Sequence, residues 1–391
     1  MSKVLFVLSG LLESVEPNAN CINNILNFFN NDIECHSLSI EKKYDALNKK
    51  NELFHTIVYS ESIYGMKNWI RKIKKFFYMP LGSNLLVKKI YDKIQKLYDH
   101  YKYNSIIAVV NPVESAEAVY RFKKNNPKVK CILYEIDPAS NRYKNPAGLI
   151  ERLWKKKSIR WEQKIYSSFD FIIHMQTHKV HFSQKYYKKF ADKTLFLDIP
   201  IFRIFNYKQK NMDLTDIRFL YAGVFYQKLR EPDYMINIFK HLEKSMNFSL
   251  NIYTGGIMKK YVENLIRGSQ AIQLFDLIEQ SALNKVVEKS DILISVGNVN
   301  SDFLPSKVLY YIGTGKKIIH FFSDENDVAN NYLKRYKNAL LVDQRKDVDL
   351  NVEKIKDFLE IEYYPISSAE LINLYVKNTP EYTAQKFMEI I

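Results

Sequence analysis

Residues 291–322 bring together groups that could bind a phosphorylated ligand. They read DILISVGNVNSDFLPSKVLYYIGTGKKIIHFF, in which an apolar strand ends at residues 297–298 and a helix is predicted to begin at residues 305–307. The start of a helix carries free N–H groups and a partial positive charge. Ser306 and Lys307 would add a hydroxyl and an ammonium group. The pattern predicts a diphosphate site, and the alternative is an ordinary helix start with a surface lysine.

A second group of basic residues follows another predicted strand. Residues 219–232 read FLYAGVFYQKLREP, in which the apolar strand ends at Gly223 and is followed by Lys228 and Arg230. The planar guanidinium group of arginine binds phosphate oxygens bidentately. These two side chains are therefore candidates for contacting the same anionic ligand, and the alternative is a solvated loop.

The first half of the chain carries isolated polar groups at the ends of predicted strands. Gly10 follows the strand over residues 3–9, and Asp137 follows the strand over residues 130–136. Asp137 is the best candidate in this half for contacting a ligand, and a role as a turn or helix-cap residue explains it equally well. The three histidines in residues 174–181 lack the spacing of a zinc-binding helix, so we assign no metal site.

Strands that alternate with helices must position these groups. Such alternation predicts parallel α/β sheets, whose ligands bind outside the carboxyl ends of the strands. The predicted strands are residues 3–9, 105–110, 130–136, 169–175 and 194–199 in the first half, and 218–222, 249–253, 291–296, 317–322 and 339–342 in the second. The pattern restarts after Pro200, so the sequence predicts two successive doubly wound α/β domains.

The predicted boundaries follow from this restart. Residues 1–205 form the N-terminal domain and residues 206–366 form the C-terminal domain. Residues 367–391 are expected to form one last helix, which could pack back across the N-terminal domain.

The two basic segments resemble the donor site of GT-B glycosyltransferases. The resemblance is greatest to the large retaining family (family 4-like) that assembles bacterial capsule and exopolysaccharide. That family's loop typically reads GN, PSK, a helix with an EY pair, then GKPII, and here the chain reads GN, PSK, YY and GKKII. Residues 219–232 resemble the opening of the family's C-terminal domain. The N-terminal domain matches only in its rhythm of strands and helices.

This resemblance implies a fold and an activity. The fold would be two Rossmann-like domains that face a cleft, with the acceptor on the N-terminal domain and the donor on the C-terminal domain. The reaction would move a hexose-type sugar from a nucleotide-diphosphate donor, most readily a UDP-sugar, to a polysaccharide or lipid-linked saccharide. It would be retaining and independent of metal, with the nucleotide-sugar as substrate and no cofactor.

The resemblance also implies roles for individual residues. Lys228 and Arg230 would neutralise the departing diphosphate, Asp302 would touch the sugar, and Asp137 completes the catalytic candidates. Gly223 would let the backbone approach the nucleotide closely. The candidate donor-binding residues are Gly10, Gly223, Gly297, Asn298, Phe303, Leu304, Ser306, Lys307 and Tyr310.

One position departs from the family pattern. The family places two glutamates eight residues apart, and the corresponding residues here are Asp302 and Tyr310. A tyrosine hydroxyl cannot hold both hydroxyls of a ribose as a carboxylate does. This departure supports an alternative function, a non-catalytic GT-B partner subunit of an active glycosyltransferase.

Charge is distributed unequally along the chain. The 391 residues carry a net charge of +15, and residues 1–200 hold 33 Lys and Arg against 19 Asp and Glu. Residues 201–391 hold 25 against 24. The excess predicts an anionic partner for the first half. A nucleic acid is the weakest of the candidates, because no RNP, KH or zinc-finger pattern accompanies the charge.

A basic amphipathic stretch points to a membrane surface as that partner. Residues 67–102 contain ten Lys and Arg against two Asp and Glu, and residues 155–160 could extend the patch. The expected membrane-contacting residues are Trp69, Arg71, Lys72, Lys74, Lys75 and Phe76. The alternative is a core-facing helix with a solvated lysine face. With three cysteines and neither a signal peptide nor a membrane span evident, we expect a cytoplasmic protein peripheral to the inner face of the plasma membrane.

Overall fold

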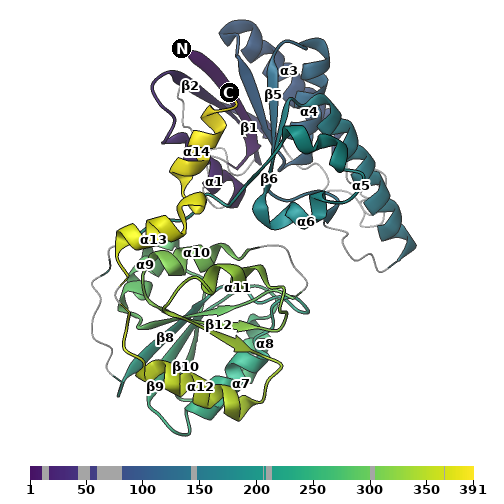
Figure 1. The fold of residues 1–391 in the computed structure, drawn as a ribbon. Helices are drawn as coiled ribbons and strands as arrows, with labels where there is room; N and C mark the ends of the chain where they lie inside the picture. The colour runs from purple at the N-terminus through teal and green to yellow at the C-terminus, as the bar shows by residue number, and fades with distance from the viewer. Residues whose placement is uncertain are drawn as a thin grey trace. The chain divides into compact units, whose positions relative to one another are not determined.

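A computed structural model of the chain describes residues 1–10, 17–42, 53–59, 82–141, 148–205, 207, 214–299, 304–364 and 366–391. These residues form two compact units (Figure 1). The first unit contains Met1–Ile201 and Lys377–Ile391, and the second contains Phe202–Val376. Each unit is built on one parallel sheet with helices on both of its faces.

The first unit contains a seven-stranded sheet with the order β3-β2-β1-β4-β5-β6-β7. Its strands are β1 (Ser2–Ser9), β2 (Ile33–Lys42), β3 (Phe54–Tyr59), β4 (Ser105–Val109), β5 (Lys130–Glu135), β6 (Phe171–Met175) and β7 (Thr194–Leu197). The strand order reverses between β1 and β4, which is where ligands of such sheets bind.

Helices cover the apolar faces of this sheet. They are α1 (Pro17–Leu26), α3 (Asn84–Tyr101), α4 (Val113–Asn125), α5 (Leu149–Ser168), α6 (Lys179–Phe182) and α14 (Pro380–Met388), with short 3₁₀ turns η3 (Gln176–His178) and η4 (Lys188–Lys193). Alternate residues of β1 enter two different cores, Leu5 on one face and Phe6 on the other. Because both faces are buried, the strand reads as a continuous apolar run.

The C-terminal helix belongs to the first unit. In place of one helix over residues 367–391, the chain forms α13 (Ser368–Leu374), the 3₁₀ turn η5 (Val376–Asn378) and α14. Pro380 lacks an N–H group and occupies the first position of α14, where no intrahelical partner is needed. The Phe387 ring of α14 is buried and packs on Tyr134, with 5.3 Å between ring centroids.

The second unit contains a six-stranded parallel sheet with the order β10-β9-β8-β11-β12-β13. Its strands are β8 (Ile217–Ala222), β9 (Phe248–Tyr253), β10 (Ile272–Phe275), β11 (Ile292–Val296), β12 (Lys317–Phe322) and β13 (Ala339–Asp343). Besides α13, the helices described in this unit are α7 (Asp233–Leu242), α8 (Lys259–Leu265), α9 (Gln280–Lys289), α10 (Ser306–Gly313), α11 (Val328–Leu333) and α12 (Val348–Glu360). Here the order reverses between β8 and β11.

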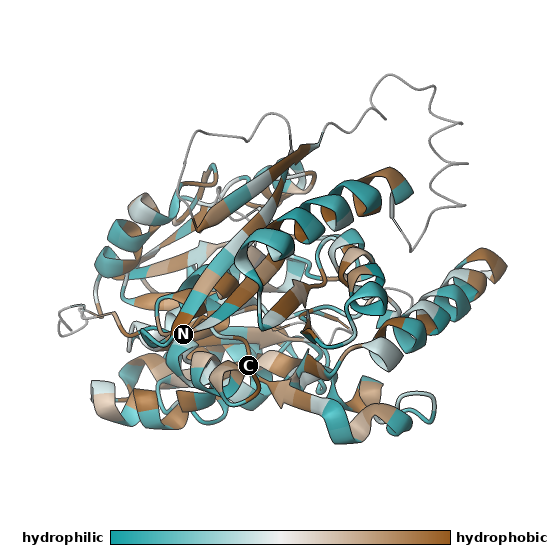
Figure 2. Ribbon diagram, turned by 90° about the horizontal axis from the view of Figure 1, so that it is seen from above, coloured by the Kyte–Doolittle hydropathy of each residue, from teal (hydrophilic) through white to brown (hydrophobic). Residues whose placement is uncertain are grey.

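Both sheets are therefore parallel and doubly wound, as the alternation of strands and helices predicts. In Figure 2, hydrophobic residues run along the strands inside the sheets, while the outer faces of many helices are hydrophilic. The fold class predicted from the sequence is confirmed for each unit.

Candidate functional site

The strongest candidate site lies at the switch point of the second sheet. Strands β8 and β11 are neighbours, with Tyr221 opposite Ile294, so their carboxyl ends lie side by side. Gly223 directly follows β8, and Gly297 directly follows β11. Helix α10 begins at Ser306, further along the chain from Gly297. Glycine-lined strand ends and a helix start thus meet at the edge where an open α/β sheet binds its ligand.

Lys307 folds over the glycine that ends β8. A Cβ atom on Gly223 would overlap the Lys307 ammonium group, which occupies the space that a side chain at this position would fill. The ammonium nitrogen lies 5.8 Å from the centroid of the Tyr221 ring. Burial, reinforced by the nearby positive charge of Arg230, lowers the pKa of Lys307 to about 7. The ammonium form is therefore disfavoured in the absence of an anion.

Arg230 is held by a neutral partner. Its Nε and Nη2 atoms donate to Oδ1 of the buried Asn298, at 3.1 and 2.8 Å. Its Nη1 atom is 3.4 Å from the carbonyl oxygen of Val224. An amide oxygen orients the guanidinium group but leaves its full positive charge available. Backbone bonding from Val299 N to Leu229 O, at 2.8 Å, joins the two loops that carry this pair.

Two basic side chains therefore share one site. Within the described ranges, neither Lys307 nor Arg230 forms an ion pair with a carboxylate. Like charges at close range repel each other, and a bound anion would relieve that repulsion. A diphosphate offers oxygens to the guanidinium fork and the ammonium group together.

Lys228 occupies the turn that presents Arg230. Tyr226 and Arg230 exchange backbone hydrogen bonds of 2.9 and 2.8 Å, which closes a tight turn over the residues between them. Lys228 has a φ of 62° at this turn, its N–H donates to Glu231 Oε1 at 2.9 Å, and it is exposed. The basic side chain buried beside Arg230 is therefore Lys307 and not Lys228. Lys307 was predicted from the sequence as a donor-binding residue.

Gly297 is required by a buried pair behind the loop. A Cβ atom at this position would overlap the carboxylate of Asp327. Asp327 Oδ2 lies 3.2 Å from His320 Nε2, and Asp327 Oδ1 accepts from the N–H of Ala329 at 2.9 Å to cap α11. The pair thus occupies the space beside Gly297, next to the Asn298 that holds Arg230. Sequence reasoning did not identify this support, because His320 reads as one polar residue within an apolar strand.

Tyr310 makes contacts within the second unit. Its hydroxyl donates to Asn284 Oδ1 of α9 at 2.8 Å. Its ring packs edge-to-face on Phe205, with 4.9 Å between centroids. Ser306 is exposed at the first position of α10, and Leu304 is partly buried just before it. The candidates Asp302 and Phe303 lie outside the described residues.

The first unit offers a separate polar cluster at its own strand ends. Gly10 ends β1 with a φ of 70°, a conformation that glycine adopts without strain. Asp137 follows β5, its side chain is 53% exposed, and its carboxylate lies 3.9 Å from Nε2 of the buried His178. No functional role was predicted for His178, since its approach to Asp137 depends on the pairing of β5 with β6.

A buried acid fixes the loop that carries Asp137. Glu162 of α5 accepts from the N–H of Ser140 at 2.7 Å and from the hydroxyl of Tyr187. Burial raises the pKa of Glu162 to about 7. Ser140 Oγ also lies 3.0 Å from His181 Nε2. This network holds the loop, and Asp137 projects from it toward solvent.

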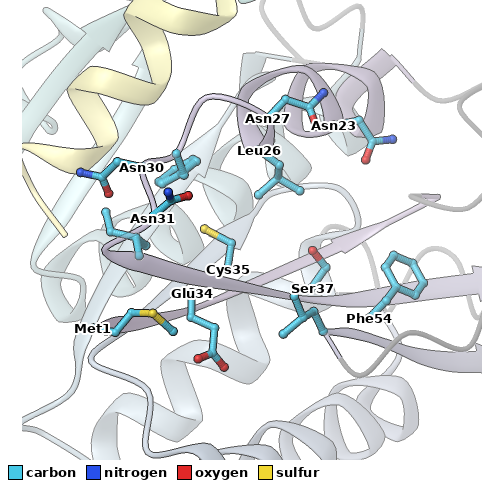
Figure 3. A pocket seen from close by; sticks show the side chains of 13 residues that line it. Met1, Asn23, Leu26, Asn27, Asn30, Asn31, Glu34, Cys35, Ser37 and Phe54 are labelled. Carbon is cyan, nitrogen blue, oxygen red and sulfur yellow. The ribbon is translucent and has the colours of Figure 1, made fainter.

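A cavity of about 700 Å³ lies elsewhere in the first unit (Figure 3). Met1, Ile33 and Phe54 line it at the starts of the first three strands, so it lies at the amino edge of the sheet. Among the described residues, no candidate predicted from the sequence lines this cavity. Ligands of parallel sheets bind at the opposite edge.

The described part of the chain contains neither a metal-binding cluster nor a membrane-spanning helix. No group of three or more His, Cys, Asp or Glu side chains there is arranged to hold a metal ion. None of the described helices is both long enough and apolar enough to cross a bilayer. The expected membrane-contacting residues Trp69, Arg71, Lys72, Lys74, Lys75 and Phe76 lie outside the described residues.

Comparison with known proteins gives the fold. Neither the protein-family models nor the curated protein sequences match this chain. Among solved structures, sucrose-phosphate synthase from Thermosynechococcus elongatus is similar, with a TM-score of 0.67, 11% identity, and coverage of 100% of this chain and 98% of that one. The lipopolysaccharide outer core galactosyltransferase WaaB has a TM-score of 0.55 and 11% identity, with coverage of 98% of each chain.

A third solved structure has the same architecture. The N-terminal domain of Candida albicans trehalose-6-phosphate phosphatase has a TM-score of 0.62 at 11% identity, with coverage of 100% of this chain and 96% of that one. At such identities the likeness concerns the fold alone. The chain therefore has the fold of GT-B structures, two Rossmann-like units on parallel sheets of seven and six strands.

Proposed function

We propose that this chain is a nucleotide-sugar-dependent glycosyltransferase whose second unit binds the donor, most readily a UDP-sugar. One observation carries the proposal, namely that Lys307 and Arg230 lie near each other at the β8–β11 switch point. The neutral amide of Asn298 holds Arg230, and neither basic side chain has a carboxylate partner in the described residues. A nucleoside diphosphate supplies the anion that such a pair lacks. The GT-B fold supports the same function.

The chemistry follows from where negative charge develops. As the bond between the sugar's anomeric carbon and the diphosphate breaks, charge grows on the departing diphosphate oxygens. Arg230, oriented by Asn298, and Lys307, lodged against Gly223, would stabilise that charge. Lys228 at the exposed turn would approach from the solvent side. Asp302 would contact the sugar, in keeping with the family resemblance.

The first unit would bind the acceptor. Asp137 is the exposed acid at the carboxyl edge of that sheet, and Glu162 holds its loop in place. We propose that Asp137 contacts a hydroxyl of a polysaccharide or lipid-linked saccharide acceptor. Transfer would be retaining, as in the family that the sequence resembles.

Nucleotide binding and donor hydrolysis test the donor site. The full chain would be tested by thermal shift with UDP-, GDP- and ADP-sugars, beside Arg230→Ala, Lys307→Met and the control Lys260→Ala, which alters an exposed lysine of α8. We expect one nucleotide class to stabilise the wild type and the control, because a ligand that binds only the folded state raises stability. Slow release of that nucleotide's diphosphate should be lost in Arg230→Ala.

A second candidate function is a non-catalytic partner subunit. It is favoured by Tyr310, whose hydroxyl bonds to Asn284 where the family has an acid. This function predicts no thermal shift with any nucleotide at millimolar concentration, and no diphosphate release. That result would overturn the donor site and leave the GT-B fold as a scaffold for an active partner.

A further inference from the structure

Helix α5 carries an exposed apolar end. Leu149, Ile150 and Leu153, in its first two turns, are 78%, 50% and 59% exposed. The buried residues of the helix all lie further along, from Ser158 to Tyr166. In Figure 1 this end of α5 extends beyond the remainder of its unit, and in Figure 2 the helix that projects at the right ends in hydrophobic residues. A water-soluble surface does not usually present three adjacent large apolar side chains on one helix end.

Positive charge flanks this apolar end. Residues 149–160 contain five Lys and Arg against one Glu. Arg152, Lys156 and Arg160 are exposed and follow one another at intervals of four, so they share one face of the helix. Leu149 and Leu153 have the same spacing and form the adjoining stripe. Apolar and basic stripes side by side are the pattern of a helix that lies at a lipid–water interface.

The buried half of α5 is firmly attached to the unit. Trp161 Nε1 donates to Glu117 Oε2 at 3.1 Å, and the Tyr166 hydroxyl donates to the buried Glu135. Glu162 accepts from the N–H of Ser140 at 2.7 Å. The buried half of α5 is therefore fixed to the loop that follows β5, while Leu149, Ile150 and Leu153 lie exposed at the start of the same helix. That loop also carries Asp137, so the exposed end of α5 and Asp137 belong to the same edge of the sheet.

We propose that the exposed end of α5 docks on an anionic lipid surface. Leu149, Ile150 and Leu153 enter the interfacial layer, and the basic stripe contacts lipid phosphate groups. An apolar end beside a basic stripe favours lipid over nucleic acid, which needs the cations alone. Docking itself is independent of catalysis. Docking would also bring a lipid-linked acceptor to the edge of the sheet that carries Asp137, and this second step rests on the proposed function.

Vesicle co-sedimentation of the full chain tests the proposal. The probes are vesicles of phosphatidylcholine alone and vesicles that also contain phosphatidylglycerol. We expect binding to the anionic vesicles only, reduced about tenfold or more in the triple variant Leu149→Ser/Ile150→Ser/Leu153→Ser. Replacing Arg152, Lys156 and Arg160 by Gln should weaken binding by about fivefold per cation.

Matched controls lie in the second unit. Leu350→Ser removes an exposed apolar side chain, and Lys244→Gln/Lys260→Gln removes exposed cations. Both should bind vesicles like the wild type. All substitutions are at exposed positions, and equal thermal midpoints and equal donor hydrolysis would show that fold and donor site are intact. Loss of vesicle binding with intact hydrolysis thus separates this proposal from the proposed function.

Three results would overturn the proposal. The first is a wild-type chain that does not bind phosphatidylglycerol vesicles. The second is binding of the serine and glutamine variants that equals wild-type binding. Equal binding to duplex DNA, abolished in the glutamine variant and retained in the serine variant, would assign the basic stripe to a nucleic acid instead.

Discussion

At the scale of single residues, the proposed donor site depends on how its two basic side chains are held. Arg230 receives its orientation from an amide oxygen of Asn298. Lys307 is placed by the missing side chain of Gly223. A carboxylate in either role would position the cation equally well but would cancel its charge. The site thus keeps the full charge of Arg230 beside a lysine whose ammonium form is disfavoured until an anion binds.

The lowered pKa of Lys307 should make the proposed anion binding depend on pH. Burial lowers this pKa to about 7, and a bound diphosphate should raise it again because it favours the ammonium form. UDP affinity contributed by Lys307 is therefore fully present below the pKa of the free site and declines as the pH rises above it. Titration calorimetry from about pH 6 to about pH 9 should show this decline.

Lys307→Arg is the matched control for that pH dependence. The arginine stays charged across the whole pH range, so the decline of UDP affinity with rising pH should disappear. Any pH dependence that comes from the nucleotide's own phosphate groups is the same in both proteins. A decline of equal size in wild type and Lys307→Arg would show that another group is responsible.

The amide of Asn298 gives a second prediction at this scale. In Asn298→Asp the new carboxylate would pair with Arg230 and neutralise it. We expect UDP affinity to fall about tenfold or more, since charge-assisted bonds to phosphate contribute about 1.5–3 kcal/mol. Asn298→Ala, which loses orientation but keeps the charge, should lose less affinity by calorimetry. If Asn298→Asp bound UDP like the wild type, Arg230 would not be contacting the anion.

At the scale of elements, helix α14 stabilises a sheet that is remote in sequence. Phe387 is fully buried, with its ring centroid 6.2 Å from Phe6 and 5.3 Å from Tyr134. Phe387→Ala should lower the free energy of unfolding by about 3–5 kcal/mol, because it leaves a cavity between the helix and the sheet. Phe28→Ala, at an exposed ring in the same unit, is the control and should cost far less. Denaturant unfolding measures both, and equal costs would contradict this packing.

The strands differ in how readily the sequence predicts them. The central strands are apolar on both faces, so β4 and β11 stand out as continuous apolar runs. Strand β2 was not predicted, because its buried positions include His36, Ser39 and Glu41, whose polar groups are paired within the fold. The short edge strand β10 reads IQLF and is partly exposed, so it also lacks an apolar run.

The same limit applies to the site. Local sequence indicates that Gly223, Arg230, Asn298 and Lys307 follow strands or begin a helix. It does not indicate that β8 and β11 are neighbours, and only that pairing brings Lys307 to Gly223 and Asn298 to Arg230. Contacts between residues far apart in the chain require the sheet order, which strand patterns alone do not specify.

At the scale of the whole molecule, the two units differ in how they use positive charge. The first half of the chain carries nearly all of the net charge of +15, and the exposed basic stripe of α5 is part of it. The second half is nearly neutral, yet it holds the half-buried pair Lys307 and Arg230. An excess spread over a surface suits a broad anionic partner, whereas a buried pair suits one small anion.

Ionic strength should separate these two uses of charge. The Debye length falls from about 10 Å at 0.1 M salt to about 3 Å at 1 M salt, so exposed charges are screened strongly and buried ones much less. Binding of the full chain to phosphatidylglycerol vesicles should therefore fall steeply with added NaCl. UDP binding should fall much less, because Lys307 and Arg230 are partly shielded from solvent by the Tyr221 ring and the strand ends. Parallel salt dependences, measured by co-sedimentation and calorimetry in the same buffers, would mean that the cation pair is as open to solvent as the surface of α5.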